Sequence, residues 1–339
     1  MKNLLSILTG ICITVSVNAQ NPDSSQQYFK KAMNEKEAGR YLVASKLFEK
    51  AIAFDVSKEA YLQLAYTQLE MKKTDYAKAS FLKVHELDPS DKTVIKELME
   101  LFFNYRQFEK ATEFAKKCSD CENNNRILGL CYYEQEDYAE AEKYLTAALK
   151  KDPNDAQITY TMGRNYVDMD EYKKAIPYYT KAIQLDDTRN VWMYELGLLY
   201  YTINDYKNAL SSLDAAAAHG YAKSNDFIEN LGYVSLYSGQ IERGESLLLD
   251  IYRRKPGNKD ILRDMAEILY QQKQYDKSLN YCQKLMEMDM KDGKALYQAG
   301  LCFQKKGEVQ RGQKMCDKAI ELDPSLDNLR RKKEMSGGL

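Results

Sequence analysis

The amino-acid sequence predicts an all-α protein in which helix-turn-helix units of about 34 residues stack into an α-α superhelix. Segments that begin at Leu128, Met162 and Leu196 repeat one pattern of apolar, small and acidic residues, with starts 34 residues apart. The apolar residues within each segment follow helical spacing. The 339 residues include only 6 Pro and 16 Gly, too few for an all-β chain rich in tight turns.

Residues 1–19 have the features of a secretory signal peptide. Lys2 precedes an apolar run from Leu4 to Val17, and the small residue Ala19 is suited to a cleavage site. The run of 14 residues (4 through 17) is shorter than the roughly 20 apolar residues of a transmembrane helix. We therefore expect export with cleavage after Ala19, and no transmembrane segment in the mature chain. A retained signal anchor is the alternative.

Residues 20–326 divide into about nine units in one register. The first unit is divergent, and the leucine slot of the later units falls at Leu64, Leu98, Leu128, Met162, Leu196, Leu231, Met265 and Ala299. Acidic or amide residues such as Glu136 and Asn204 interrupt the apolar spacing, which predicts the turn between the two helices of a unit. Asp-Pro pairs such as 88–89 end the second helix, because Pro lacks the amide donor. One hairpin cannot bury its apolar face alone, so neighbouring units must stack.

The repeated pattern resembles that of the tetratricopeptide repeat family. In the unit at Leu128 it comprises Leu128-Gly129, an aromatic residue at Tyr132, and small residues at Ala141 and Ala148. The resemblance covers nearly all of the mature chain and implies a right-handed solenoid whose first helices line a concave face. It also implies a non-catalytic scaffold for protein–protein interaction.

The resemblance places a set of side chains, most of them Tyr, in that concave groove. These residues are Tyr133, Tyr160, Arg164, Tyr194, Leu198, Tyr201, Tyr233, Tyr237 and Tyr270. The chain holds 27 Tyr against 10 Phe and 1 Trp, and Tyr suits interface hot spots since it combines apolar area with a hydroxyl. We expect the groove to dock a peptide or helix of a partner protein. Two alternatives stay open: several of the Tyr pack between adjacent helices, or the rings stack on a carbohydrate.

Six cysteines remain after removal of residues 1–19: Cys118, Cys121, Cys131, Cys282, Cys302 and Cys316. The third unit is short, since its Leu98 and the next unit's Leu128 are 30 residues apart, and the missing turn falls around Cys118 and Cys121. Small apolar core residues are one interpretation of the cysteines. A local Cys118–Cys121 disulfide at the short junction is another, and a metal or redox site is a third.

The sequence lacks the motifs of catalysis. It has 2 His, no glycine-rich phosphate loop, no nucleophile elbow and no metal-binding Cys/His cluster. We therefore expect no enzymatic activity, no cofactor and no bound metal. The net charge of −1 gives no nucleic-acid signature, although the basic run at 330–333 leaves an anionic surface as the alternative to a solvated C-terminal capping segment over 327–339. The location expected from the leader is the periplasm or cell envelope, with a function in envelope assembly.

Overall fold

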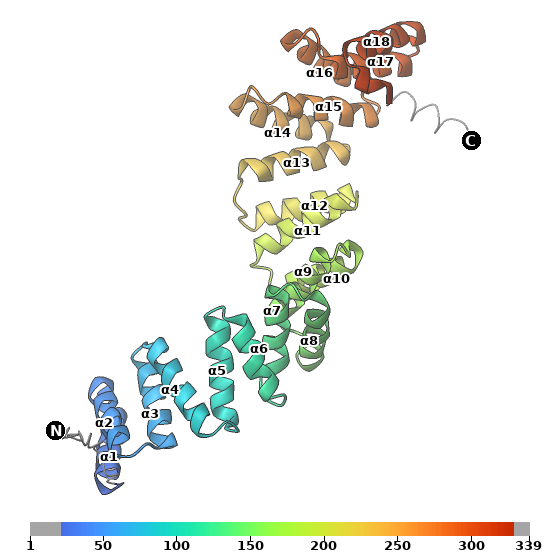
Figure 1. The fold of residues 1–339 in the computed structure, drawn as a ribbon. Helices are drawn as coiled ribbons and strands as arrows, with labels where there is room; N and C mark the ends of the chain where they lie inside the picture. The colour runs from blue at the N-terminus through green and yellow to red at the C-terminus, as the bar shows by residue number, and fades with distance from the viewer. Residues whose placement is uncertain (1–21, 329–339) are drawn as a thin grey trace, which may run out of the picture. The chain divides into compact units, whose positions relative to one another are not determined.

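The computed structural model describes residues 22–328. Over this range the chain forms 18 α-helices and one short 3₁₀ helix, with no strand (Figure 1). Consecutive helices pair into nine helix-turn-helix repeats, so the predicted fold class of an α-solenoid is confirmed. The predicted signal peptide (1–19) lies outside the described residues. Of the predicted capping segment (327–339), the structure describes only Asp327 and Asn328.

The chain divides into two compact units, and the first ends at Lys151. Within the described residues this unit contains four hairpins. They are α1 (Pro22–Glu37) with α2 (Tyr41–Phe54), α3 (Lys58–Glu70) with α4 (Thr74–Leu87), α5 (Lys92–Asn104) with α6 (Phe108–Lys117), and α7 (Asn124–Glu134) with α8 (Tyr138–Lys151).

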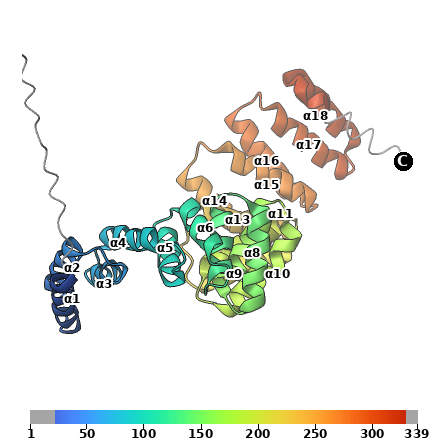
Figure 2. The same ribbon diagram turned by 60° about the horizontal axis from the view of Figure 1, so that its bottom comes forward.

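The second unit begins at Asp152 and contains five hairpins. They are α9 (Ala156–Asp168) with α10 (Tyr172–Leu185), α11 (Asn190–Thr202) with α12 (Tyr206–Ala218), α13 (Asn225–Tyr237) with α14 (Ile241–Arg254), α15 (Lys259–Gln271) with α16 (Tyr275–Met288), and α17 (Gly293–Lys305) with α18 (Val309–Leu322). The 3₁₀ helix η1 (Pro324–Leu326) follows the last hairpin. Within each unit the hairpins follow one another in chain order, as Figures 1 and 2 show.

The helix ends follow from local chemistry. Before α5, the Asp91 carboxylate accepts hydrogen bonds from the backbone N–H groups of Thr93 and Val94, which satisfies donors that an isolated helix leaves unpaired. Ser57, Asp155, Ser224 and Asp292 cap other first helices in the same way. Between the helices of a hairpin the chain passes through the left-handed region, at Glu136 with φ 61° and Asn204 with φ 62°. These are turn positions that the sequence predicted.

Glycine allows the two helices of a hairpin to approach closely. A Cβ atom on Gly129 of α7 would lie 2.9 Å from the backbone nitrogen of Leu145 on α8. A Cβ on Gly300 of α17 would lie 2.8 Å from the carbonyl oxygen of Gly312 on α18. Since real Cβ contacts do not come this close, a larger residue would push the helices apart. The leucine-glycine slot of the repeat thus sets the spacing within the hairpin.

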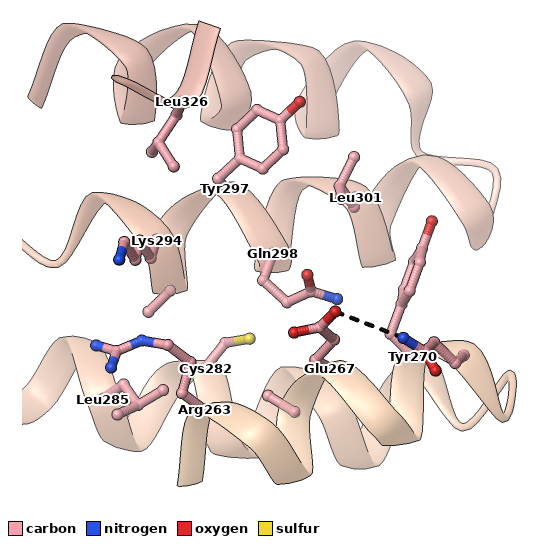
Figure 3. A pocket seen from close by; sticks show the side chains of 13 residues that line it. Arg263, Glu267, Tyr270, Cys282, Leu285, Lys294, Tyr297, Gln298, Leu301 and Leu326 are labelled. Atoms are coloured by element: carbon pink, nitrogen blue, oxygen red, sulfur yellow. Dashed lines mark hydrogen bonds between the residues drawn. The ribbon is translucent and has the colours of Figure 1, made fainter. Parts of the chain in front are cut away.

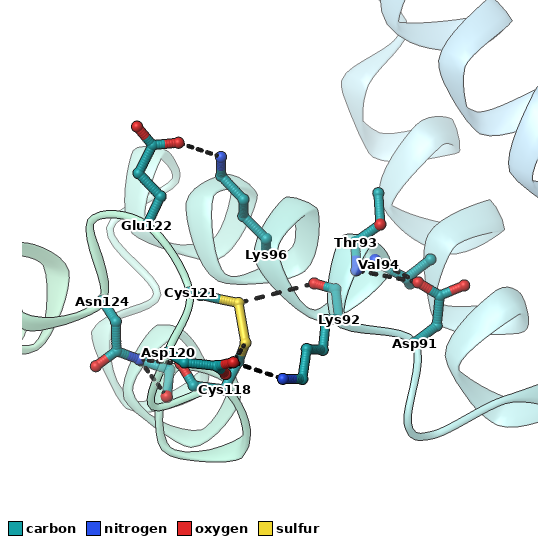
Figure 4. The surroundings of a disulfide bond; sticks show 11 residues. Asp91, Lys92, Thr93, Val94, Lys96, Cys118, Asp120, Cys121, Glu122 and Asn124 are labelled. Carbon is teal, nitrogen blue, oxygen red and sulfur yellow. Dashed lines mark hydrogen bonds and ion pairs between the residues drawn. A yellow bond between two sulfur atoms is a disulfide. The ribbon is translucent and has the colours of Figure 1, made fainter.

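The third hairpin is shortened at its second helix. α6 has 10 residues, whereas its counterparts α4 and α8 have 14. Cys118 follows α6 directly and is joined to Cys121 by a disulfide with a Cα–Cα distance of 5.3 Å (Figure 4). The Asn124 amide donates hydrogen bonds to the carbonyl oxygens of Ala115 and Cys118, so it satisfies acceptors at the end of the short helix.

Cys118 and Cys121 form a disulfide in the structure, so the interpretation of these two residues as free thiols of the core is wrong. Cys118 is buried, but Cys121 is half-buried in the connecting turn rather than in the core. The other four mature-chain cysteines are buried free thiols within the helices. None of the described helices is long and apolar enough to cross a membrane.

Candidate functional site

The structure places all nine predicted groove residues on first helices, each of them half-buried. Tyr133 lies on α7 in the first unit, where its ring is 6.3 Å from that of Tyr138. The other eight lie on α9, α11, α13 and α15 of the second unit. The surface that the second unit forms with α9, α11, α13, α15 and α17 is called the first-helix face below.

Tyr160 of α9 bridges to the next first helix. Its ring stacks on Trp192 of α11 with a centroid distance of 4.6 Å, and its hydroxyl donates to the Glu195 carboxylate at 2.8 Å. Tyr179 of α10 donates to the same carboxylate oxygen at 3.0 Å. Burial is the main cause that raises the pKa of Tyr160 to about 12, so the phenol stays protonated at neutral pH. The contact with Arg164 lowers this pKa, and Glu195 raises it. The main role of Tyr160 is therefore to pack one repeat against the next.

The same kind of bridge recurs at the next two junctions. Tyr194 of α11 accepts a hydrogen bond of 2.9 Å from the Asn230 amide on α13, and its ring is 5.7 Å from that of Phe227. Tyr233 of α13 donates to the Asp264 carboxylate on α15 at 3.0 Å. Burial is the main cause that raises the pKa of Tyr233. The open alternative that several groove Tyr pack between helices therefore describes Tyr160, Tyr194 and Tyr233.

The partners of these Tyr share one position in the repeat. Glu195, Asn230 and Asp264 are each the sixth residue of their helix, as Gln298 is of α17. No sequence motif marked this position, because the residue type changes from carboxylate to amide along the array. The signal was present only in the register, since each of these residues is the sixth of its helix.

Tyr201 and Tyr237 gather near the turns of their hairpins. The ring of Tyr237 stacks on Tyr206 at 4.5 Å, and Tyr201 lies 6.0 Å from both rings. Burial raises the pKa of Tyr237 to about 12, and it raises that of Tyr201. Leu198 lies on α11 between the Tyr194 bridge and this cluster and is half-buried. The bridging residues Tyr160, Tyr194 and Tyr233 are thus distinct from the cluster of Tyr201 and Tyr237, and the predicted residues do not form one continuous aromatic strip.

A pocket of about 420 Å³ opens between α15 and α17 on the first-helix face (Figure 3). Tyr270 is the one predicted groove residue that lines it. Its floor is apolar, and charged or amide side chains surround it. The lining residues are Arg263, Ala266, Glu267, Tyr270, Gln271, Cys282, Leu285, Lys294, Ala295, Tyr297, Gln298, Leu301 and Leu326.

Two buried donors in the pocket wall make no hydrogen bond to the described residues. They are the Gln298 amide nitrogen and the Arg263 Nε, although the Arg263 terminal nitrogens pair with Asp260 at 3.0 Å and Asp292 at 2.9 Å. Figure 3 shows the side chains of Gln298 and Glu267 extending toward one another from the two helices. A buried donor without an acceptor is costly, so this pocket is suited to a ligand that brings an acceptor.

The part of the chain that the structure describes contains no group of three or more His, Cys, Asp or Glu residues that could hold a metal ion. Burial raises the pKa of the Cys131 and Cys282 thiols to about 12, so these side chains stay protonated and are poor nucleophiles. The arrangement is that of a packed helical array with an amphipathic surface, suited to holding another molecule.

These features define a class of protein: helical repeat proteins that present a surface made of first helices. Sequence models of the tetratricopeptide repeat match residues 58–91, 120–188, 160–225 and 293–326, which together cover about half of the chain. The chain belongs to the tetratricopeptide repeat family. Proteins built from these repeats generally mediate protein–protein interaction and are typically non-catalytic scaffolds.

One solved structure supports the fold. The C-terminal part of a TPR repeat-containing protein from Cytophaga hutchinsonii is similar with a TM-score of 0.52 and 17% identity, over 70% of this chain and 99% of that one. A tetratricopeptide repeat protein from Parabacteroides merdae is similar with a TM-score of 0.45 and 13% identity, over 73% and 99% of the two chains. No curated protein sequence matches the chain.

Proposed function

We propose that this protein is a non-catalytic, exported scaffold that docks an extended segment or a helix of a partner protein on the first-helix face. The observation that carries the proposal is the open pocket between α15 and α17, which continues the face from Leu198 and the tyrosine cluster toward η1. Such a mixture of apolar floor, aromatic side chains and charged margin is typical of peptide-binding surfaces.

The tyrosines of the first-helix face have two different roles, which follow from their contacts. Tyr160, Tyr194 and Tyr233 are engaged between helices and fix the spacing of the repeats. Tyr237, Tyr270 and Leu198 supply contact area to the partner. Aromatic anchors supply most of the affinity in such interfaces. Arg164, whose side chain is 38% exposed, lies 3.9 Å from Glu195 and offers a charge that sets the register of the bound segment.

A carbohydrate ligand is supported by no contact in the structure. Sugars stack on open aromatic faces, whereas Tyr160 stacks on Trp192, Tyr194 stacks on Tyr221, and Tyr237 stacks on Tyr206. Each of these rings therefore has one face covered by another ring of the protein. We retain the protein-docking function as the proposal.

The proposed location is the periplasm or cell envelope, with a function in envelope assembly. Its support is the leader over 1–19 in the sequence and the Cys118–Cys121 disulfide, since disulfides persist in oxidising compartments. N-terminal sequencing of the protein from fractionated cells tests this location. Gln20 as the first residue in the envelope fraction supports export, and an intact Met1 in the cytosolic fraction contradicts it.

Affinity capture tests the docking surface. The bait is residues 20–339, compared with a variant that carries Leu198→Glu and Tyr270→Ala. A matched control changes two exposed second-helix residues, Ser211→Glu on α12 and Asn280→Ala on α16. Circular dichroism first confirms that all three baits are folded. We expect a protein that is captured by the wild type and the control but lost with the face variant; equal capture by all three baits contradicts the proposal.

A further inference from the structure

We propose that the pocket between α15 and α17 receives a tyrosine side chain of the partner protein. This inference rests on the proposed function, because it names the chemistry of the partner at one end of the first-helix face. It is drawn from a comparison of the four junctions between successive first helices in the second unit.

At three of the four junctions a tyrosine of the protein itself occupies the space between first helices. Tyr160 bonds to Glu195, Tyr194 to Asn230 and Tyr233 to Asp264, with oxygen–oxygen or oxygen–nitrogen distances of 2.8 to 3.0 Å. In every case the bonded partner is the sixth residue of the following helix. The junction therefore has a fixed plan, in which a phenol from one repeat meets a polar side chain of the next.

At the fourth junction, between α15 and α17, the phenol is missing but its polar partner is present. The bridging tyrosine is the fifth residue of α9 and of α11 and the ninth residue of α13. The residues of α15 at these two positions are Arg263 and Glu267. Gln298 occupies the sixth position of α17, and its amide nitrogen is buried without a hydrogen bond to the described residues. The third position, filled by Trp192 on α11 and Phe227 on α13, is Ala295 on α17.

These substitutions create the pocket. Arg263, Glu267, Ala295 and Gln298 all line the volume of about 420 Å³, and Figure 3 shows them on facing helices. The position of Ala295 holds an aromatic ring in α11 and α13 and Ile261 in α15, and the tyrosine ring of the preceding junctions is absent here. An aromatic side chain buries about 150–250 Å² and would cover the apolar floor, which includes Leu285.

The polar groups select tyrosine over other side chains. The Gln298 amide nitrogen requires an acceptor, as the Asn230 amide finds in the hydroxyl of Tyr194. Glu267 offers an acceptor of its own, and a phenol both accepts and donates one hydrogen bond. A phenylalanine or an aliphatic side chain would fill the apolar floor but leave the Gln298 amide without an acceptor.

Two soluble probes test the inference on the protein comprising residues 20–339: N-acetyl-L-tyrosinamide and N-acetyl-L-phenylalaninamide. The readout is the NMR chemical shift of the methyl groups of Ala295 and Leu301. We expect saturable shifts with the tyrosine probe and about fivefold weaker binding of the phenylalanine probe, the effect of one hydrogen bond. The Gln298→Leu variant should bind both probes equally.

The Ala295→Phe variant is a second test, because it places a ring where Phe227 stands in α13. With thermal unfolding unchanged, it should abolish the shifts of Leu301 by either probe. Absence of saturable shifts in the wild type overturns the inference, as does equal binding of both probes by the wild type or unchanged binding by Ala295→Phe. If neither probe binds while a partner still docks on Leu198 and Tyr270, this inference alone fails. If the tyrosine probe binds but no partner docks, the proposed function alone fails.

Discussion

The hydroxyl of Tyr179 on α10 donates a hydrogen bond of 3.0 Å to the carboxylate of Glu195 on α11, although the Tyr179 residue is only 2% exposed. The same carboxylate oxygen accepts the hydroxyl of Tyr160 from α9. One side chain thus joins three consecutive helices and satisfies two phenols in the packed interface. Removal of the Glu195 carboxylate should therefore weaken the packing between two repeats.

We therefore expect Glu195→Leu to lower the free energy of unfolding by about 1–3 kcal/mol, the cost of leaving a buried hydroxyl without an acceptor. The matched control is Glu229→Leu, because Glu229 on α13 is half-buried as Glu195 is but acts on its neighbour Tyr233 through charge alone, so its loss should change stability less. Urea denaturation and hydrogen exchange of the amides in α9 to α11 provide the measurement. Equal effects of the two substitutions would contradict a specific role of Glu195.

The contact between Gly300 and Gly312 makes a second prediction. A Cβ on Gly312 would fall on the carbonyl oxygen of Gly300, so Gly312→Ala must push α18 away from α17. We expect a loss of about 1–3 kcal/mol in the free energy of unfolding, as overpacking in a core costs. Helix propensity alone would make Gly312→Ala more stable by about 1 kcal/mol. A loss of stability therefore indicates overpacking, and a gain indicates helix propensity.

The control for this substitution is Gly257→Ala, since an added Cβ at Gly257 would meet no atom within 4 Å. Thermal unfolding of the two variants beside the wild type gives the comparison. A Gly312→Ala variant at least as stable as the wild type would show that the α17–α18 approach is looser than described.

The buried thiols predict selective protection from alkylation. Burial raises the pKa of Cys131 and Cys282 to about 12, and it raises that of Cys302. Iodoacetamide at pH 8.5 should therefore modify none of the three in the folded protein, and all of them in denaturant. Cys118 and Cys121 should react only after reduction. Peptide mass spectrometry reads the sites, and rapid native labelling of Cys282 would contradict its burial.

The same pKa shifts predict how stability depends on pH. The folded state holds the Cys131 and Cys282 protons up to about pH 12, whereas the unfolded chain loses them near pH 8.5. Since the folded state binds more protons in this window, the contribution to stability is fully present below about pH 8.5 and declines as the pH rises. Urea midpoints at pH 7, 9 and 10 should fall in that order, and a Cys131→Ala, Cys282→Ala variant should show a smaller decline.

The disulfide makes a local prediction for the third hairpin. Closing a loop from Cys118 to Cys121 stabilises the folded state by about 2 kcal/mol in the chain-entropy account. We expect Cys118→Ser with Cys121→Ser to increase hydrogen exchange in α6 and at the start of α7. Helices α3 and α4 provide an internal reference, because repeat arrays lose stability locally. Uniform acceleration in all four helices, or none in α6, would contradict this assignment.

The sequence alone predicted the nine hairpins, because a repeated register is visible without coordinates. The turns at Glu136 and Asn204 followed from the interrupted apolar spacing, and the short third unit from the distance between Leu98 and Leu128. Spacing could not decide between thiols and a disulfide at Cys118 and Cys121. That choice depends on where α6 ends and on the turn that follows it, which the repeat spacing does not contain.

The site was predicted less completely than the fold. Assignment to first helices was sound for residues such as Leu198 and Tyr270, because it needs only the register. The bridge from Tyr160 to Glu195 depends on side-chain rotamers and on the lateral offset of stacked helices, which a repeat pattern does not contain. The pocket was missed since it arises from small or substituted residues, Ala295 among them, and motif searches seek residues that are present.

Site-specific photocrosslinking tests the central claim most directly. A photoreactive phenylalanine analogue is placed at Leu198 or Tyr270 on the first-helix face, and at Lys181 on α10 or Lys284 on α16 as exposed second-helix controls. The full chain is expressed in its source organism, irradiated, and analysed by mass spectrometry. We predict one partner protein crosslinked from Leu198 and Tyr270 and absent from Lys181 and Lys284. Crosslinks confined to the second-helix positions, or equal from all four, would contradict docking on the first-helix face.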